Sequence, residues 1–194
     1  MIIGVSGPIA AWTDSVAAIL VEQGFKWFSF SDVLREEAKL RGLEINRKAL
    51  QDLGDELRKT GGTGAIAKKI MEQFVEGENY VVGNIRNPGE VEELKKLNDF
   101  FLIKVDASLE IRFERIKSRN RDDDVLDFSE FKKVEERDLG IGQEEHGQRH
   151  ADVFELADFE IINEGTEEDL RKEIEAILSL IKRMQHAMSR TESS

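Results

Sequence analysis

Short apolar runs alternate along the chain with longer stretches in which apolar residues recur every three to four positions. The short runs are rich in β-branched or aromatic residues, which favour buried strands, whereas the longer stretches have the spacing of amphipathic helices. The five predicted strands span residues 2–6, 26–30, 80–82, 100–105 and 159–162. This alternation predicts an α/β fold, in which a parallel sheet of about five strands is flanked by helices in three layers.

Polar residues ahead of the helical stretches predict where helices begin. Asp14, Ser31, Asn46 and Thr166 each precede a run with helical periodicity. Their side chains are of the types that accept hydrogen bonds from the first free backbone N–H groups of a helix. We therefore expect these four residues to be N-caps.

Two stretches depart from the regular alternation. Residues 42–75 hold two consecutive helical patterns separated by Gly61-Gly62-Thr63-Gly64, which predicts a helical insertion able to close over a ligand. Residues 119–142 are dense in charge and contain Gly140 and Gly142, as is typical of a lid. We expect one domain over residues 1–185 and a flexible tail over residues 186–194.

Composition excludes several classes of protein. No segment approaches the roughly 20 apolar residues of a membrane span, and the first apolar run is too short for a signal peptide. The absence of cysteine excludes disulfides and thiolate zinc sites and is compatible with the cytoplasm, where we expect the protein. A net charge of −12 opposes attraction to nucleic acid or anionic lipid, so we expect neither as a partner.

The loop after the first predicted strand has the position of a phosphate-binding loop. A strand, a glycine and a helix start place backbone N–H groups and a helix dipole where an anion can bind. We assign this role to the whole loop, which is Gly7, Pro8, Ile9, Ala10, Ala11, Trp12, Thr13, Asp14 and Ser15.

This loop departs from the Walker A consensus, which requires a second glycine, then lysine, then serine or threonine. Those positions are Trp12, Thr13 and Asp14, and the nearest hydroxyl follows at Ser15. We expect the Trp12 ring to fill space near the phosphates. Thr13 is neutral, so we expect the loop to lack the lysine charge that stabilises the transferred phosphoryl group.

The segment Phe28-Ser29-Phe30-Ser31-Asp32-Val33-Leu34-Arg35-Glu36 resembles the second strand and following helix of adenylate-kinase-like enzymes. Val81-Val82-Gly83-Asn84-Ile85-Arg86-Asn87-Pro88 resembles their third strand and the arginine after it. The resemblance implies that Asp32, Arg35 and Arg86 bind the phosphate of an acceptor nucleotide. Relatives carry an aspartate near Asn84 that orients magnesium, so the neutral Asn84 removes a second charge. As an alternative, Arg35 and Arg86 are surface partners of neighbouring glutamates.

The resemblance continues through the lid and covers residues 1–183 in order. It implies that the arginines of this region embrace the transferred phosphoryl group and that Gly165, in Ile161-Ile162-Asn163-Glu164-Gly165-Thr166, lies near the donor base. The arginines concerned are Arg115, Arg119, Arg121 and Arg137. Dephospho-CoA kinases and deoxynucleotide kinases share this pattern, so the sequence does not identify the acceptor substrate.

The chain is therefore identified as resembling P-loop nucleoside or deoxynucleoside monophosphate kinases with an altered Walker A loop. The family implies phosphoryl transfer from ATP, with Mg²⁺ bound through ATP and Ser15, and small-molecule nucleotides as partners of a monomer or homodimer. The alternatives are a catalytically impaired pseudokinase that acts as a binding or regulatory module, an engineered loop variant of an active kinase, and a dephospho-CoA kinase-like acceptor.

Two further features have simpler interpretations. His146 and His150 have the i,i+4 spacing of metal ligands, but we expect a solvated pair at the edge of the lid. Trp27 and the neighbouring phenylalanines are expected to belong to the core and not to a platform for a base.

Overall fold

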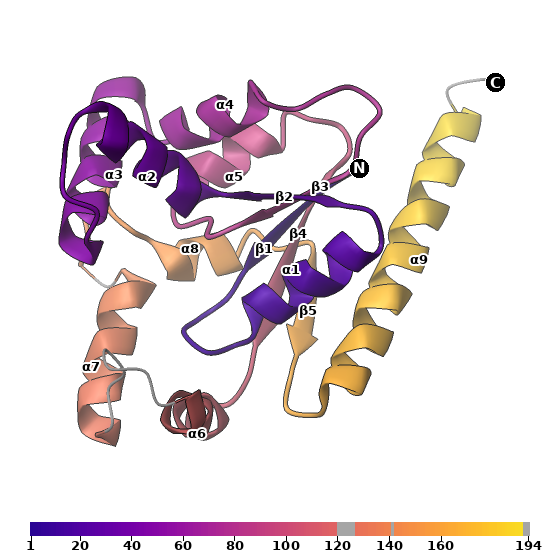
Figure 1. The fold of residues 1–194 in the computed structure, drawn as a ribbon. Helices are drawn as coiled ribbons and strands as arrows, with labels where there is room; N and C mark the ends of the chain where they lie inside the picture. The colour runs from indigo at the N-terminus through magenta and orange to yellow at the C-terminus, as the bar shows by residue number, and fades with distance from the viewer. Residues whose placement is uncertain (120–126, 141, 192–194) are drawn as a thin grey trace.

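The computed structural model describes residues 1–119, 127–140 and 142–191, and Figure 1 shows their arrangement. Five parallel strands form one sheet in the order β2-β3-β1-β4-β5. Their bounds are Ile2–Ser6 (β1), Lys26–Ser29 (β2), Tyr80–Gly83 (β3), Phe100–Asp106 (β4) and Phe159–Ile162 (β5). The predicted α/β class and parallel sheet are confirmed.

Helices connect the strands and cover both faces of the sheet. Their bounds are Thr13–Glu22 (α1), Phe30–Leu40 (α2), Arg47–Gly61 (α3), Ala65–Met71 (α4), Pro88–Leu94 (α5), Leu109–Arg119 (α6), Phe128–Leu139 (α7), His150–Phe154 (α8) and Glu167–Thr191 (α9). The predicted pair of helices before residue 75 corresponds to α3 and α4. None of the helices in the described part of the chain is both long and apolar enough to cross a membrane.

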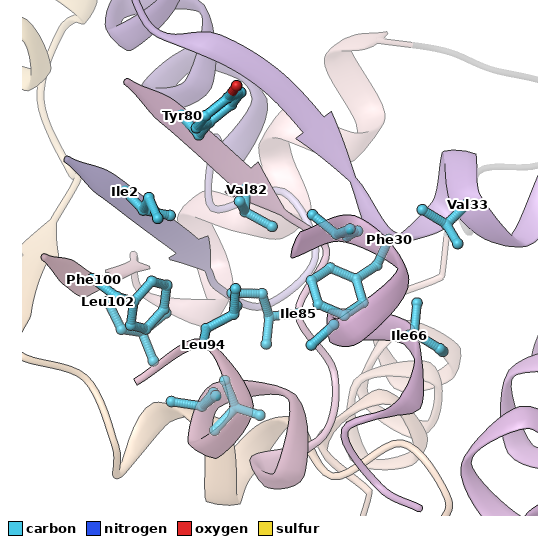
Figure 2. Packing of buried hydrophobic residues seen from close by; sticks show 14 of the residues in the cluster. Ile2, Phe30, Val33, Ile66, Tyr80, Val82, Ile85, Leu94, Phe100 and Leu102 are labelled. Carbon is cyan, nitrogen blue, oxygen red and sulfur yellow. The ribbon is translucent and has the colours of Figure 1, made fainter. Parts of the chain in front are cut away.

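The two faces of the sheet bury separate apolar cores because successive strand side chains point to opposite sides. Ile2 and Val82 pack with α2 to α5 and α8, whereas Ile3 and Val81 pack with α1 and α9. Figure 2 shows the first of these cores, in which Phe30 from α2 lies beside Ile85, just after the end of β3. This layering holds the carboxyl ends of the strands at one edge of the sheet, where ligands bind in such folds.

A third, smaller cluster lies outside the sheet. Phe113 and Ile116 of α6 pack with Phe131 of α7, and Ile9 and Ala10 of the β1–α1 loop pack against them. Phe131 is fully buried. The loop is therefore anchored by α6 and α7. Figure 1 shows these two helices at the lower left, near the β1–α1 loop.

Two of the four predicted N-caps are correct. Asn46 accepts a hydrogen bond from the N–H of Ala49 at 2.9 Å, and Thr166 Oγ1 accepts one from the N–H of Asp169 at 3.2 Å. Ser31 is not a cap, because α2 already begins at Phe30 and Ser29 Oγ accepts the N–H of Ser31 instead. The strand predicted to reach residue 30 therefore ends one residue earlier, at Ser29.

The prediction of Asp14 as a cap is also wrong. Helix α1 begins at Thr13, and Trp12 occupies the N-cap position without a side-chain hydrogen bond. The loop turns into the helix through a left-handed backbone conformation at Trp12, which makes the polar residue two positions later part of the first turn.

Candidate functional site

The β1–α1 loop is a tight turn with two non-glycine residues in the left-handed region. Ala10 has φ of 61° and Trp12 has φ of 72°. Both conformations are unfavourable for residues with a Cβ atom and are usually taken by glycine. Between them, the N–H of Ala11 donates to the carbonyl of Pro8 at 3.2 Å. The loop thus has the local backbone shape that a glycine-rich loop adopts, although its sequence contains one glycine.

Gly7 opens this loop at a close approach between two strands. A Cβ atom at Gly7 would lie 2.2 Å from the carbonyl oxygen of Val105 in β4, which is far inside the contact distance. Only glycine fits there without moving the backbone of β4 or the loop.

The Trp12 ring packs against α6. It lies against the guanidinium of Arg115, whose Cζ is 4.1 Å from the ring centroid. The cavity beside the loop is lined by Pro8, Ile9, Thr13 and other residues, but Trp12 is not among the described residues that line it. The contact with Arg115 holds the ring on α6.

The cavity beside the loop has a volume of about 190 Å³. The β3 side contributes Asn84, Ile85 and Arg86, and Asp138 and His150 close it from α7 and α8. Its lining residues are Val5, Ser6, Gly7, Pro8, Ile9, Ala10, Thr13, Asp14, Asn84, Ile85, Arg86, Asp138 and His150. Residues of the loop, one arginine and two aspartates therefore line one space.

A larger groove of about 670 Å³ lies next to this cavity. It contains all three predicted acceptor-binding residues, Asp32, Arg35 and Arg86, so the structure brings them together. The two hollows share Ile9, Asp14, Asn84, Arg86 and Asp138. The loop and the groove are thus adjoining parts of one site.

The two predicted acceptor arginines have different surroundings. Arg35 donates to the carboxylate of Asp32 at 2.6 Å, and both side chains are about half exposed. Arg86 donates from Nη1 to Oε1 of Gln148 at 3.0 Å and is partly buried. The alternative of a glutamate partner for Arg35 is wrong, because Arg35 pairs with Asp32 in the same helix. Such an exposed ion pair contributes little to stability.

Asn84 stands at the carboxyl end of β3 with φ of 61°. Its amide Nδ2 donates to Ser29 Oγ at 3.0 Å, which links the ends of β3 and β2. The side chain at this position is neutral and positioned by that bond.

Three groups in the site were not predicted as site residues. Arg58 of α3 lines the groove and donates from Nε and Nη2 to Glu90 Oε1, with both side chains buried. Gln148 lines the groove beside Arg86. Trp27 was assigned to the core, but it is 38% exposed and lines the groove because β2 is the edge strand of the sheet.

His150 is buried, which corrects the expectation of a solvated histidine pair. It is 7% exposed, whereas His146 has a side-chain exposure of 28% and lies 3.3 Å from Glu144. Burial, with the positive charges of Arg86 and Arg58 nearby, lowers the pKa of His150 to about 3. Nε2 of His150 has no hydrogen-bond partner within the described residues, and these residues contain no group of three or more metal-ligating side chains.

The remaining predicted residues lie around the loop or outside the described part of the chain. Arg115 lies beside the loop and donates from Nη1 to the carbonyl of Ala10 at 3.3 Å. Ser15 lies in the first turn of α1, and Gly165 lies between β5 and α9. Arg119 belongs to α6 and Arg137 to α7, but their side chains are not among the parts of the chain that the structure describes. Arg121 lies wholly outside the described residues.

Comparison with protein families and known sequences gives consistent matches. Residues 13–132 match the family model described as an AAA domain. A UPF0200/UPF0201 protein of Archaeoglobus fulgidus is 39% identical over 170 residues, which are 84% of this chain and 50% of that relative. The chain therefore spans half the length of that relative. A UPF0200 protein of Sulfurisphaera tokodaii is 33% identical over 182 residues, covering 93% of this chain and 97% of the relative.

Solved structures with similar folds include two kinases. Shikimate kinase from Aquifex aeolicus has a TM-score of 0.53 and 18% identity, covering 95% of this chain and 99% of its own. Dephospho-CoA kinase from Campylobacter jejuni has a TM-score of 0.50 and 19% identity, covering 93% and 96%. A TM-score of 0.58 at 23% identity relates the chain to TT1252 from Thermus thermophilus, with 92% and 96% covered. At these identities the likeness shows a kinase-like fold.

Proposed function

The chain belongs to the UPF0200 protein family and to the AAA domain family, and from that premise we propose that it binds nucleotides. The donor is ATP with Mg²⁺, bound at the β1–α1 loop. The acceptor is a nucleoside or deoxynucleoside monophosphate, bound in the groove beside Arg35 and Arg86. The reaction is the transfer of one phosphoryl group from the first to the second.

The observation that carries this proposal is the junction of the two hollows. Asp14, Asn84 and Arg86 line both the loop cavity and the groove, so ligands held in each would meet there. Phosphoryl transfer is catalysed mainly by positioning and charge, and it requires the two substrates to be in contact. Arg86 at the junction supplies a cation to either phosphate.

The acceptor side is supported by its cations. Arg35 lies with Asp32 at the groove, and Arg58 lies deeper in it, paired with Glu90. Guanidinium groups suit the geometry of phosphate oxygens. We assign the acceptor phosphate to Arg35 and Arg86, with Asp32 holding Arg35 in place.

The donor side relies on the loop backbone and on the residues around it. N–H groups from Gly7 to Ser15 would cradle the β-phosphate, and the base would lie toward Gly165. The proposed clamp on the transferred group consists of Arg115 beside the loop and the lid arginines Arg119, Arg121 and Arg137. These assignments come from the resemblance of the sequence to monophosphate kinases.

Magnesium fits the residues at the start of α1. Asp14 is exposed and lines both hollows, and its carboxylate is the type of oxygen ligand that Mg²⁺ prefers. Asp14 would hold the ion together with ATP, and the resemblance adds the hydroxyl of Ser15. Bound Mg²⁺ would supply charge neutralisation at the donor phosphates.

A second candidate function is a binding or regulatory module without transfer. Thr13 and Asn84 favour it, because both lie in the loop cavity as neutral side chains at positions where kinases carry charge. A missing charge of this kind lowers the rate of transfer by about a hundredfold or more while leaving binding through N–H groups in place. Binding and turnover therefore need separate measurements.

The test combines calorimetry with a coupled assay. Mg-ATP, a panel of ribo- and deoxynucleoside monophosphates and dephospho-CoA are titrated separately and then assayed in pairs for ADP release. We expect binding of Mg-ATP and of one acceptor class, and an Arg35→Met variant should weaken acceptor binding about tenfold or more. Lys39→Met, one helical turn away and outside the groove, is the matched control.

The outcomes separate the candidates. Turnover with any acceptor supports the kinase, binding without turnover supports the module, and absence of binding for both ligand classes refutes nucleotide binding altogether. If Trp12→Gly with Thr13→Lys creates Mg-ATP binding that the present chain lacks, the loop is an altered version of an active one. An unchanged double variant refutes that alternative.

A further inference from the structure

The β1–α1 loop holds an unfavourable backbone conformation at two positions within three residues. Ala10 and Trp12 both have φ above 60°, and neither is glycine. In an unconstrained chain, each such residue would populate the left-handed region rarely. Contacts from elsewhere in the molecule must therefore select this conformation, and the loop's own hydrogen bond from Ala11 to Pro8 is too local to do so alone.

Two arginines of α6 bind successive carbonyl groups of this loop. Arg112 Nη1 donates to the carbonyl of Ile9 at 3.1 Å, and Arg115 Nη1 donates to the carbonyl of Ala10 at 3.3 Å. The orientation of a carbonyl is set by the dihedral angles on either side of it. These two bonds therefore bear directly on the backbone between Ile9 and Ala11.

Arg115 also fixes the second strained residue. Its guanidinium lies over the Trp12 ring, with Cζ 4.1 Å from the centroid, and its Nη2 donates to the carbonyl of Asn163 at 2.8 Å. A planar guanidinium can stack on an indole and donate in its own plane at the same time. One side chain thus joins Ala10, Trp12 and the end of β5.

Arg112 is itself held rigidly. It forms a bidentate pair with Glu135 of α7 at 2.5 and 2.6 Å, and its Nε donates to the carbonyl of Ala107 at 2.9 Å. Its side chain is 6% exposed and that of Glu135 is 9% exposed. A buried pair with several hydrogen bonds has little freedom, so it gives the loop a fixed partner.

We propose that Arg112 and Arg115 are positioning residues that hold the phosphate loop in its left-handed conformation, in place of the glycines that usually permit it. The ligand-binding form of the loop then depends on α6. This inference rests on the proposed binding of phosphate groups at the loop. In it Arg115 acts through the loop backbone, and this role replaces the direct clamp on the phosphoryl group that the resemblance implies for Arg115.

Glycine substitution at Ala10 provides the decisive test. Glycine takes positive φ without penalty, so Ala10→Gly should make the loop less dependent on Arg115. The probe is inorganic pyrophosphate with Mg²⁺, titrated by calorimetry into the whole chain. Arg115→Met should weaken its binding about tenfold, which corresponds to one strained residue. Adding Ala10→Gly to Arg115→Met should restore most of the lost affinity.

Ala11→Gly is the matched control, since Ala11 is adjacent but has no positive φ. It should not restore binding to the Arg115→Met variant. Arg115→Lys, which keeps one donor but not the planar group, should bind with intermediate affinity. If Ala10→Gly fails to rescue Arg115→Met, or if Ala11→Gly rescues it equally, the positioning role is refuted and a direct contact of Arg115 with phosphate is favoured.

A second measurement keeps this test independent of ligand binding. Amide hydrogen exchange of the peptide covering residues 7–12 is measured without ligand, where the N–H of Ala11 is hydrogen-bonded to Pro8. Arg115→Met should speed its exchange several-fold relative to the unaltered chain, with circular dichroism confirming a folded variant. Equal exchange in both proteins overturns the positioning role, whereas failure of pyrophosphate to bind the unaltered chain overturns the proposed function.

Discussion

Burial of His150 should make the stability of the protein depend on pH. The lowered pKa of His150, about 3 in the folded state, lies below the ordinary value of 6.5 expected after unfolding. The unfolded chain therefore takes up the proton first as the pH falls, and stability present above pH 6.5 is lost progressively down to about pH 3. Between pH 7 and pH 5 this group alone should lower the free energy of unfolding by about 2 kcal/mol.

Urea denaturation of the unaltered chain and of a His150→Gln variant at the two pH values isolates this contribution. Other groups titrate in both proteins, so the difference between the two pH dependences belongs to His150. We expect the unaltered chain to lose about 2 kcal/mol more than the variant on going from pH 7 to pH 5. His146→Gln, at the partly exposed histidine four residues earlier in the sequence, is the matched substitution. Parallel curves for the unaltered chain and His150→Gln would show that the imidazole is solvated and that the burial argument is wrong.

Other substitutions test the supports of the site. Glu90→Gln should cost about 3–5 kcal/mol in urea denaturation, because it removes the buried one of the two carboxylates that contact the guanidinium of Arg58 and leaves Asp55 at 3.4 Å. Gly7→Ala should abolish ligand binding at the loop in calorimetry, since its Cβ would lie 2.2 Å from the Val105 carbonyl. Phe131→Ala should cost about 3–5 kcal/mol by removing the centre of the α6–α7 cluster, and unchanged thermal unfolding would contradict that packing.

The sheet could be predicted from the sequence because its signal is local. Apolar runs with β-branched residues mark each strand, and the helical period between them requires a parallel sheet. Asn46 and Thr166 were correct as caps since a cap bonds within three residues of itself. Ser31 was wrong by two residues because a serine lies on each side of the true boundary, and sequence alone does not distinguish them.

The site residues that could be predicted are likewise those whose signal is local in the sequence. Arg35 and Arg86 follow strands closely, so their meeting at the sheet edge could be predicted. Arg58 could not be, because its role depends on Glu90, 32 residues away, and it reads as one more charge on an amphipathic helix. The direction of the Trp12 ring depends on Arg115, about a hundred positions later, and no local pattern encodes that contact.

The departure of the β1–α1 loop from the Walker A consensus concerns both shape and charge, and the structure differs between the two. The loop has a left-handed backbone at Trp12 without a glycine there, and α6 binds the carbonyls and the indole that this backbone presents. The charge has no comparable replacement in the loop cavity, where Thr13 is neutral, Asp14 is acidic and Arg86 is the one lysine or arginine among the described lining residues. Backbone N–H groups depend on shape, whereas stabilisation of a transferred phosphoryl group depends on charge. Binding should therefore be retained more fully than turnover, and an assay of turnover alone would underestimate what this loop can do.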